Sequence, residues 1–332
     1  MTLSNALQQA WYRPRSWSLC LLPLSWLFRL VAMLRRFYQQ RLFPSPALPV
    51  PVIVVGNISV GGTGKTPLLA SLVDHFIKLG YRPGVISRGY GGDHGDSPML
   101  VTPESSAEQV GDEPLLLARH CPVVVSKDRY QAGLFLLEHT DCDLIMSDDG
   151  LQHYRLPRDI ELVIVDGERG FGNRQCLPAG PLREPVKRLG EVDFVLVNGS
   201  DSGHEVAEQE VFHLLPIGLR DLKQGTVVAP QQWHGGKRVH AVAGIGNPQR
   251  FARSLKTLGL EPILHPLPDH HVFSGEELTF DDDLPVIITA KDAVKCAHFG
   301  LDNLWVLDVT AVLSSDVLTR LAKRVAKLNK SA

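Results

Sequence analysis

The chain has 332 residues, of which 44% are hydrophobic and 21% charged, the composition of an ordinary globular protein rather than a disordered or polytopic one. This length is sufficient for two domains that each bury a core. A formal net charge of −2 argues against general binding of nucleic acid. Five scattered cysteines without CxxC spacing indicate reduced thiols in a cytosolic protein, with no disulfide framework and no zinc site.

The first segment of the chain is basic and apolar. No Asp or Glu occurs before Asp74, whereas six arginines precede the glycine-rich loop described next. An apolar run at 17–34 lies among them. It is shorter than the ~20 apolar residues of a transmembrane helix, and Pro23 and Arg29 interrupt it. We therefore expect a monotopic helix that lies on an anionic lipid surface. The alternative is an N-terminal helix that packs on the domain or on a partner.

The most informative segment is SVGGTGKTP, Ser59 to Pro67. An apolar, β-branched strand is predicted before it, at 51–57, and a helix after it, at 67–80, where apolar residues recur at helical spacing. A phosphate-binding loop requires this strand–loop–helix context, because glycine N–H groups and the helix N-terminus then face one anion. The alternative is a glycine-rich loop that only turns the chain.

A phosphate-binding loop gives each part of this segment a role. Lys65 is expected to reach the β- and γ-phosphates of a nucleotide, and the Thr66 hydroxyl to ligand Mg²⁺. Ser59 stands where the GxxxxGK[ST] pattern has glycine, and the glycines that follow are expected to keep the loop flexible. The predicted nucleotide-binding residues are Ser59, Val60, Gly61, Gly62, Thr63, Gly64, Lys65 and Thr66.

Acidic residues lie at two later places that suit phosphoryl transfer. Asp112 and Glu113 stand between a glycine and a proline that begins a helix. They are either caps that interact with the helix dipole, or they include a base that takes a proton from an acceptor hydroxyl. Asp148 and Asp149 close an apolar strand, as in a Walker B segment, which favours Mg²⁺ binding over a turn role. Arg88, after a predicted second strand, is either a phosphate contact or a solvated side chain.

A long loop of Gly, Pro and Arg follows the strand that begins at Ile160, and such loops inside compact domains are usually functional or form a lid. Arg183 and Glu184 in this loop either contact phosphate and metal or are surface charges. Because predicted strands alternate with helices, we expect an α/β fold: a P-loop NTPase-like, doubly wound, mostly parallel sheet with a second, smaller α/β domain and an N-terminal membrane-associated helix. The predicted ranges are 1–45 for the N-terminal region, 46–210 for the P-loop kinase domain and 211–332 for the second domain.

The second half has fewer signals. Its boundary is expected within 200–226, because 201–210 is polar and loses periodicity. A strand, a GIGNP turn and a helix are predicted at 237–260, without the third glycine and the acid of a dinucleotide site. His270 and His271 are typical of a loop cluster or a helix cap, because no third metal ligand occurs at suitable spacing.

Seven motifs in chain order resemble one family. VVGNISVGGTGKTP, VISRGYGG, GDEP, SDDGLQH, LPAGPLREP, PDHHVF and TAKDAVK are similar to those of the tetraacyldisaccharide 4′-kinase (lipid A 4′-kinase) family of Gram-negative bacteria. The resemblance implies transfer of the γ-phosphate of ATP to the 4′-hydroxyl of a tetraacyldisaccharide 1-phosphate, in lipopolysaccharide biosynthesis. It implies an acylated disaccharide phosphate as substrate, ATP and Mg²⁺ as cofactors, and a peripheral location on the cytoplasmic face of the inner membrane, with no nucleic acid and no protein partner required.

The resemblance also assigns residues. It implies that Asp112 is the general base and that His270 pairs with it, while Lys65 takes its P-loop role and Arg183 neutralises phosphate charge. Because the two members of the pair fall in different predicted domains, we expect them to meet when a hinge closes over the nucleotide. His271 receives no role. The implied metal ligands are Thr66, Asp148, Asp149, Glu113 and Glu184.

Two other functions are consistent with parts of the sequence. A P-loop ATPase or GTPase switch would hydrolyse nucleotide under the control of a protein partner and would ignore glycolipid. A membrane-tethering module would do no chemistry, which the acids at Asp112, Asp148 and Asp149 make a poor explanation.

Overall fold

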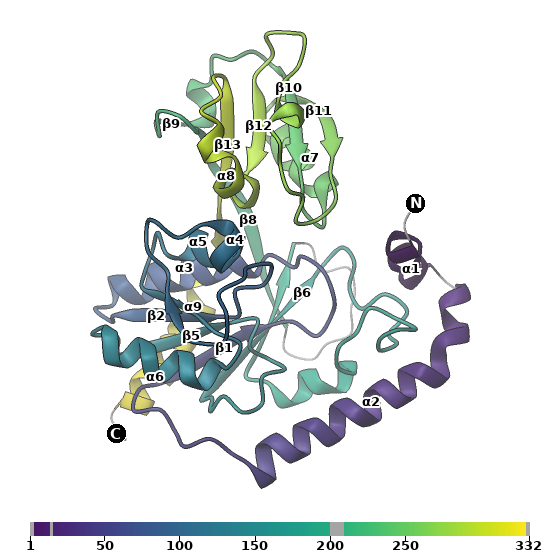
Figure 1. Cartoon of the computed structure of the whole chain (residues 1–332), viewed down its shortest axis with the longest axis vertical. Helices are drawn as coiled ribbons and strands as arrows, with labels where there is room; N and C mark the ends of the chain where they lie inside the picture. Colours follow the sequence, from purple (N-terminus) through teal and green to yellow (C-terminus); the bar gives the residue numbers. More distant parts are fainter. Residues whose placement is uncertain (1–2, 14–15, 200–208, 330–332) are drawn as a thin grey trace.

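The structure is a computed structural model that describes residues 3–13, 16–199 and 209–329. Its described strands form one path of neighbours in the order β11-β10-β12-β13-β8-β7-β6-β1-β5-β2-β4-β3, with β9 paired to β8. Figure 1 shows that this path divides into two parts, one above the other, joined by the long strand β8. We call the strands β1 to β7 the first sheet and β10 to β13 the second sheet.

The first sheet is parallel except at β3, as the alternation of strands and helices predicts. Its central strand β1 leads directly into the glycine-rich loop, and β5 and β6 flank it. Every residue of β1, β2, β5, β6 and β7 is buried, which explains their nearly continuous apolar sequences. The strands are β1 (Val52–Gly56), β2 (Pro83–Ser87), β3 (Met99–Leu100), β4 (Val123–Val125), β5 (Leu144–Asp148), β6 (Ile160–Asp166) and β7 (Phe194–Asn198).

Helices cover both faces of the first sheet, so the fold is doubly wound. Alternate residues of β1 enter different cores: Ile53 packs with α3, and Val54 packs with α6. The helices of this part are α3 (Lys65–Lys78), α4 (Ala107–Val110), α5 (Asp112–Leu117) and α6 (Arg129–His139). The helices predicted after the glycine-rich loop and from about Arg129 are therefore present.

The second sheet is parallel along β11-β10-β12-β13, and β8 joins it by pairing antiparallel to β13. At its other end β8 pairs parallel to β7, so a single strand belongs to both sheets. The elements of this part are β8 (Gln209–Asp221), β9 (Val227–Val228), β10 (Arg238–Ala243), α7 (Pro248–Thr257), β11 (Glu261–Pro266), β12 (Val286–Thr289), α8 (Ala290–Cys296) and β13 (Leu304–Val312). The irregular segment predicted at 201–210 lies almost entirely outside the described residues.

The last helix returns to the first sheet. Val317, Leu321 and Val325 of α9 (Ser315–Asn329) are buried in the same core as Leu68 and Leu72 of α3. By packing, α9 thus belongs with the P-loop part, although 211–332 was the range predicted for the second domain. We propose that the second domain runs from within β8 to the end of β13.

The N-terminal region is helical and lies along the edge of the first part, away from the second sheet (Figure 1). It comprises α1 (Leu3–Trp11), η1 (Trp17–Leu21), α2 (Leu22–Phe37) and η2 (Tyr38–Leu42). Pro23 and Arg29 interrupt the apolar sequence but not the helix, because one helical stretch of 26 residues spans Trp17–Leu42 and is by length and composition apolar enough to cross a membrane. Pro23 lies in the first turn of α2, where its missing N–H costs no helical hydrogen bond.

The helix α2 shows the reverse of the usual distribution of polar and apolar residues. Its face toward the protein includes Ser25, which is fully buried and donates a hydrogen bond from Oγ to the Cys176 carbonyl at 2.8 Å. Arg36 on the same side pairs with Glu191 at 2.7 Å. Its outer face carries large apolar side chains that are about half exposed or more, namely Leu24, Trp26, Leu27, Leu30, Val31, Met33, Leu34 and Phe37.

Candidate active site

The glycine-rich loop lies between β1 and α3, as predicted. Gly61 and Gly64 have φ angles of 111° and 92°, which only glycine adopts without strain. A Cβ added to Gly64 would lie 2.5 Å from the Asn198 amide nitrogen, so a second constraint keeps this position glycine. Ser59 does not have a left-handed backbone and is buried in a bridge with Leu182, which explains why serine is accepted there.

Lys65 points from the start of α3 toward the end of β5. Its Nζ is 3.4 Å from Asn57 Oδ1 and 3.5 Å from Asp149 Oδ1. Asp149 is also bound by Arg183, whose Nη1 donates to its Oδ2 at 2.8 Å. Burial alone would raise the pKa of Asp149, but the charges of Lys65 and Arg183 lower that pKa well below its usual range. Three predicted site residues from three separate segments thus form one charged cluster.

Asp148 ends β5 and is almost fully buried. Its Oδ2 accepts a hydrogen bond from Ser87 Oγ at 3.2 Å, whereas its Oδ1 has no hydrogen-bond partner among the described residues. Burial and the nearby negative charge of Glu113 raise the pKa of Asp148 to about 7. A buried carboxylate with an unpaired oxygen is costly unless a positive group approaches it.

Asp112 and His270 come together from the two parts of the molecule. Asp112 begins α5 and is buried, and its Oδ2 lies 3.4 Å from His270 Nδ1. Burial would raise the pKa of Asp112, but the hydrogen bond from His270 and the charges of Lys295 and Lys291 lower it overall. The pair predicted from the family motifs is therefore assembled in this conformation, and Asp112 is an ionised carboxylate, the form that accepts a proton.

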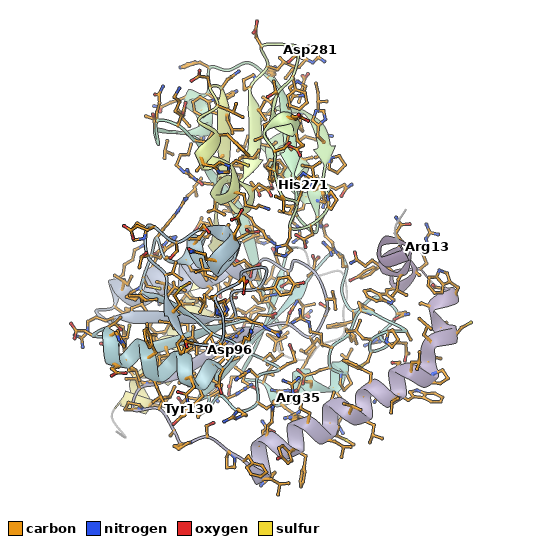
Figure 2. All side chains as sticks on the ribbon, viewed as in Figure 1. Arg13, Arg35, Asp96, Tyr130, His271 and Asp281 are labelled. Carbon is orange, nitrogen blue, oxygen red and sulfur yellow. The ribbon has the colours of Figure 1, made fainter. Side chains whose placement is uncertain are left out.

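Other predicted residues lie in different surroundings. Glu184 is buried, and its two oxygens accept hydrogen bonds from Gln152 at 2.7 Å and from Tyr154 at 2.6 Å. Among the described residues no hydrogen bond or ion pair joins it to Asp148, and its link to the charged cluster runs through Gln152 to Arg183. Arg88 is exposed on its loop. His271 Nε2 donates to Glu277 Oε1 at 2.9 Å, and Figure 2 shows His271 at the end of the second part that faces the first.

Several contacts at this site were not predicted. Asn57 orients Lys65, Gln152 joins Arg183 to Glu184, and the lysines of α8 surround the Asp112–His270 pair. The spacing of Lys291 and Lys295, four residues apart at a helix start, was a usable signal, because such residues share one helix face.

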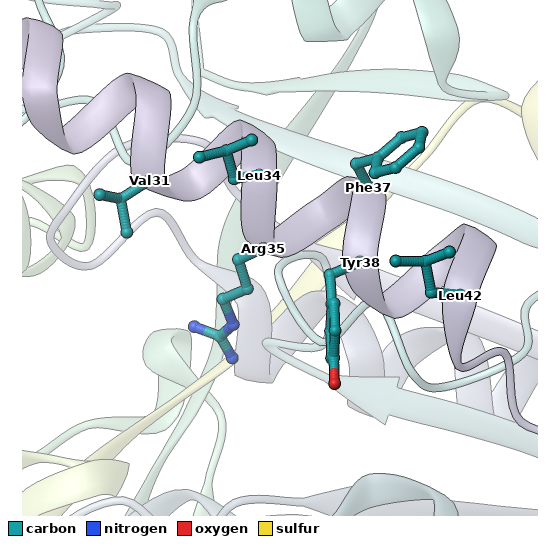
Figure 3. Close-up of a pocket in the computed structure, with 6 residues that line it drawn as sticks. All are labelled: Val31, Leu34, Arg35, Phe37, Tyr38 and Leu42. Atoms are coloured by element: carbon teal, nitrogen blue, oxygen red, sulfur yellow. The ribbon is translucent and has the colours of Figure 1, made fainter.

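An apolar hollow lies elsewhere, on the outer helix. It is lined by Val31, Leu34, Arg35, Phe37, Tyr38 and Leu42. In Figure 3, Arg35 and Tyr38 extend from one side of this helix and Leu34 and Phe37 from the other. None of the predicted nucleotide-binding residues contributes to it.

Comparison with known proteins identifies relatives over nearly the whole chain. The model of the tetraacyldisaccharide-1-P 4′-kinase family matches residues 17–326. A tetraacyldisaccharide 4′-kinase of Nitrosococcus oceani is 47% identical over 98% of this chain and 96% of that protein. A protein of the same name from Pseudomonas fluorescens is 49% identical over 94% of this chain and 93% of its own length.

The fold is similar to that of a solved crystal structure. The crystal structure of the "apo" form of LpxK from Aquifex aeolicus in complex with ATP has a TM-score of 0.77 and 29% sequence identity, covering 93% of this chain and 99% of that one. The predicted α/β fold class is thereby confirmed. From the extent of these matches and the order of its motifs, this chain belongs to the tetraacyldisaccharide-1-P 4′-kinase family.

Proposed function

We propose that this protein transfers the γ-phosphate of ATP to the 4′-hydroxyl of a tetraacyldisaccharide 1-phosphate, as the names of its relatives indicate. The observation that supports this best is the approach of His270 Nδ1 to within 3.4 Å of the buried Asp112. Asp269, the residue before His270, and Gly62 of the glycine-rich loop both lie against Gly246, so the pair is near that loop. In the proposed step, Asp112 takes the proton of the 4′-hydroxyl. The 4′-oxygen then bonds to the γ-phosphorus, while the bond from that phosphorus to the β–γ bridging oxygen breaks and ADP leaves.

The chain's own residues have distinct proposed roles in this step. Backbone N–H groups of 59–66 and the N-terminus of α3 bind the phosphates. Lys65 and Arg183 offset the charge of the transferred group, and Arg183 is kept in place by Asp149. His270 donates to one oxygen of Asp112, which leaves the other oxygen free to face the acceptor hydroxyl.

The proposed Mg²⁺ fits this cluster. Among the described residues no group of three or more His, Cys, Asp or Glu is arranged as a metal site. Mg²⁺ bound beside a nucleotide, however, needs only one or two carboxylates besides phosphates and water. The unpaired Asp148 Oδ1, with Asp149 and Thr66, supplies such a set, and Glu113 lies close enough to raise the pKa of Asp148. When bound, Mg²⁺ would neutralise charge on the phosphates.

We also propose that α2 lies in the cytoplasmic leaflet of the inner membrane. Its polar side is used against the protein, through Ser25 and Arg36, and its exposed side is apolar. A helix with one face bound along the protein body is suited to lie in an interface rather than to cross it. This position would bring the active site to an acylated substrate in the bilayer.

Labelled ATP and acylated disaccharide phosphate in detergent test the proposed reaction. We expect label in the glycolipid with the wild type, and losses on the order of 100-fold or more with Asp112→Asn and with His270→Gln. ATP binding should be retained in both variants, which separates chemistry from nucleotide affinity. Normal ATP hydrolysis without any labelled glycolipid from the wild type would contradict the proposal and favour a P-loop switch.

A further inference from the structure

Lys291 lies behind the Asp112–His270 pair and has no role in the proposed step. It is the second residue of α8, in the TAKDAVK motif. Its Nζ is 3.2 Å from His270 Nε2, 3.3 Å from Asp269 Oδ1 and 3.9 Å from Glu113 Oε1. Its side chain is only 18% exposed, so these contacts replace most of its hydration.

The chemistry of this contact determines where the His270 proton resides. A lysine ammonium has three N–H donors and no acceptor, so His270 Nε2 can contact it favourably only as an unprotonated acceptor. The single proton of the neutral ring is then on Nδ1, the nitrogen 3.4 Å from Asp112 Oδ2. In the other neutral tautomer, the Nε2–H of His270 would point at the Lys291 ammonium. The unprotonated Nδ1 would then face the Asp112 carboxylate, so that two hydrogen-bond acceptors would lie against each other.

We propose that Lys291 is a positioning residue that fixes the tautomer and ring orientation of His270, so that His270 donates to Asp112. This inference rests on the function proposed above, because it concerns the base of that reaction. Apart from the effect of its charge on Asp112, Lys291 acts through His270, and it does not itself contact the reacting atoms.

The surrounding structure supports a fixed geometry for this contact. His270 has a left-handed backbone, with φ of 59°, and its N–H donates to the Gly244 carbonyl at 3.2 Å. The Gly244 N–H in turn donates to Asp292 at 3.1 Å. Asp292 is fully buried in the first turn of α8, next to Lys291. The first turn of α8 therefore carries Lys291, and through the bond from Gly244 to Asp292 it also fixes the loop that contains His270.

Lys295 strengthens the same arrangement from the next turn. Its Nζ donates to the His271 carbonyl at 3.0 Å and lies 3.5 Å from Asp112 Oδ2. Because Lys295 contacts Asp112 directly, its removal would change the base itself. Lys291 is the better test of an effect that passes through His270.

The test compares Lys291→Met, which keeps the length of the side chain without a donor, with Lys291→Arg, which keeps a donor. Lys127→Met is the control, because Lys127 forms an exposed ion pair with Asp96 that includes neither Asp112 nor His270. Long-range ¹H–¹⁵N spectra of histidine-labelled protein, with His270 assigned by His270→Gln, report the tautomer without any turnover. We expect an Nδ1–H tautomer in the wild type and in Lys291→Arg, and a shift toward Nε2–H in Lys291→Met.

In kinetics, we expect Lys291→Met to lower kcat by about 10-fold or more, with little change in KM for ATP. This loss is part of the 10²–10⁴-fold contribution of a general base. In a His270→Gln background the same substitution should cause no further loss, because the two residues act as a unit. An unchanged His270 tautomer in Lys291→Met, or equal losses in both backgrounds, would overturn the inference. If the wild type leaves glycolipid unmodified, the proposed function fails, whereas the tautomer measurement still stands.

Discussion

His153 belongs to the loop between β5 and β6, and its ring is neutral in the folded protein. Its Nε2 accepts a hydrogen bond from the Arg129 N–H at 3.3 Å. Burial, together with the positive charge of Arg129, lowers the pKa of His153 from 6.5 to about 4. The ring is thus kept in the form that can accept this hydrogen bond.

This shift predicts a dependence of stability on pH. Between pH 6.5 and about 4 the unfolded chain binds a proton at His153 and the folded chain does not, so the free energy of unfolding falls as the pH is lowered through that window. The full effect is roughly 3 kcal/mol. Urea midpoints at pH 7.5 and 4.5 should differ less for His153→Gln than for the wild type, with the exposed His298→Gln as control. Equal differences in all three proteins would contradict the prediction.

The sequence predicted individual site residues where chemistry is encoded locally. Lys65 and Asp149 were each recognised from their own segment, and the structure places them 3.5 Å apart. The pairing of Asp112 with His270 came only from the family resemblance, because no local pattern relates residues in different parts of the molecule. The roles of Tyr154 and Gln152 as partners of Glu184 were not predictable, since the sequence shows Gln152 only as one member of the SDDGLQH motif and Tyr154 as a residue of the loop that follows.

At the scale of elements, the regular strands and helices of the first sheet were predictable, whereas the two-residue strands β3 and β9 and the longer β8 and β11 were missed. For β8 and β11 the reasons are identifiable. β8 contains Pro216 and Gly218, residues that argue against a strand. The structure accommodates them through a shift in register opposite Asp308 and Val309. β11 begins and ends near prolines, which suits its position at the edge of the second sheet.

The outer face of α2 predicts binding to lipid vesicles. Leu27, Leu30 and Leu34 are 57%, 48% and 56% exposed. Replacing all three with serine removes several methylene groups from the proposed lipid contact, and burial of each methylene contributes about 0.8 kcal/mol to binding. Sedimentation with anionic vesicles should therefore show binding weakened on the order of 100-fold. ATP binding should be unchanged, because the helix contributes no predicted nucleotide contact.

A matched control for that experiment uses exposed apolar residues of the first part, Ile77, Leu79 and Leu134, which are 44%, 49% and 39% exposed. Their replacement by serine should leave vesicle binding unchanged. If both triple variants lost binding equally, the lipid contact would be distributed over the surface, and the assignment of α2 would be wrong.

For the whole molecule, arginines join the two parts beside the phosphate-binding loop. Arg250 of α7 donates to Asp166, at the end of β6, at 2.8 Å. Arg169 donates to the Gly246 carbonyl at 2.9 Å and lies next to Gly61. These contacts place the GIGNP turn against the loop that is predicted to bind nucleotide. They therefore favour the closed arrangement in which Asp112 meets His270.

Removal of one such contact should open the molecule. Arg250→Met leaves the buried Asp166 with only the longer ion pair to Arg169, at 3.7 Å, and removes a contact between the two parts. We therefore expect a larger radius of gyration by X-ray scattering and a kcat lowered on the order of 10-fold, because losing a hydrogen bond to a buried charged group costs about 1–3 kcal/mol. Arg82→Met is the control, since the exposed Arg82 pairs with the partly buried Asp143 within the first part. An unaltered scattering profile together with unaltered kcat would show that Arg250 does not hold the two parts together.

The return of α9 to the first core has a consequence for the order of assembly during translation. The strands of the second sheet leave the ribosome before α9 does, and they form a parallel sheet whose buried residues pack in two cores of their own, apart from Ala311 at the end of β13. The nucleotide-binding part, in contrast, lacks Val317, Leu321 and Val325 until α9 has been synthesised. The inserted part is thus able to fold while the part that was begun first is still incomplete.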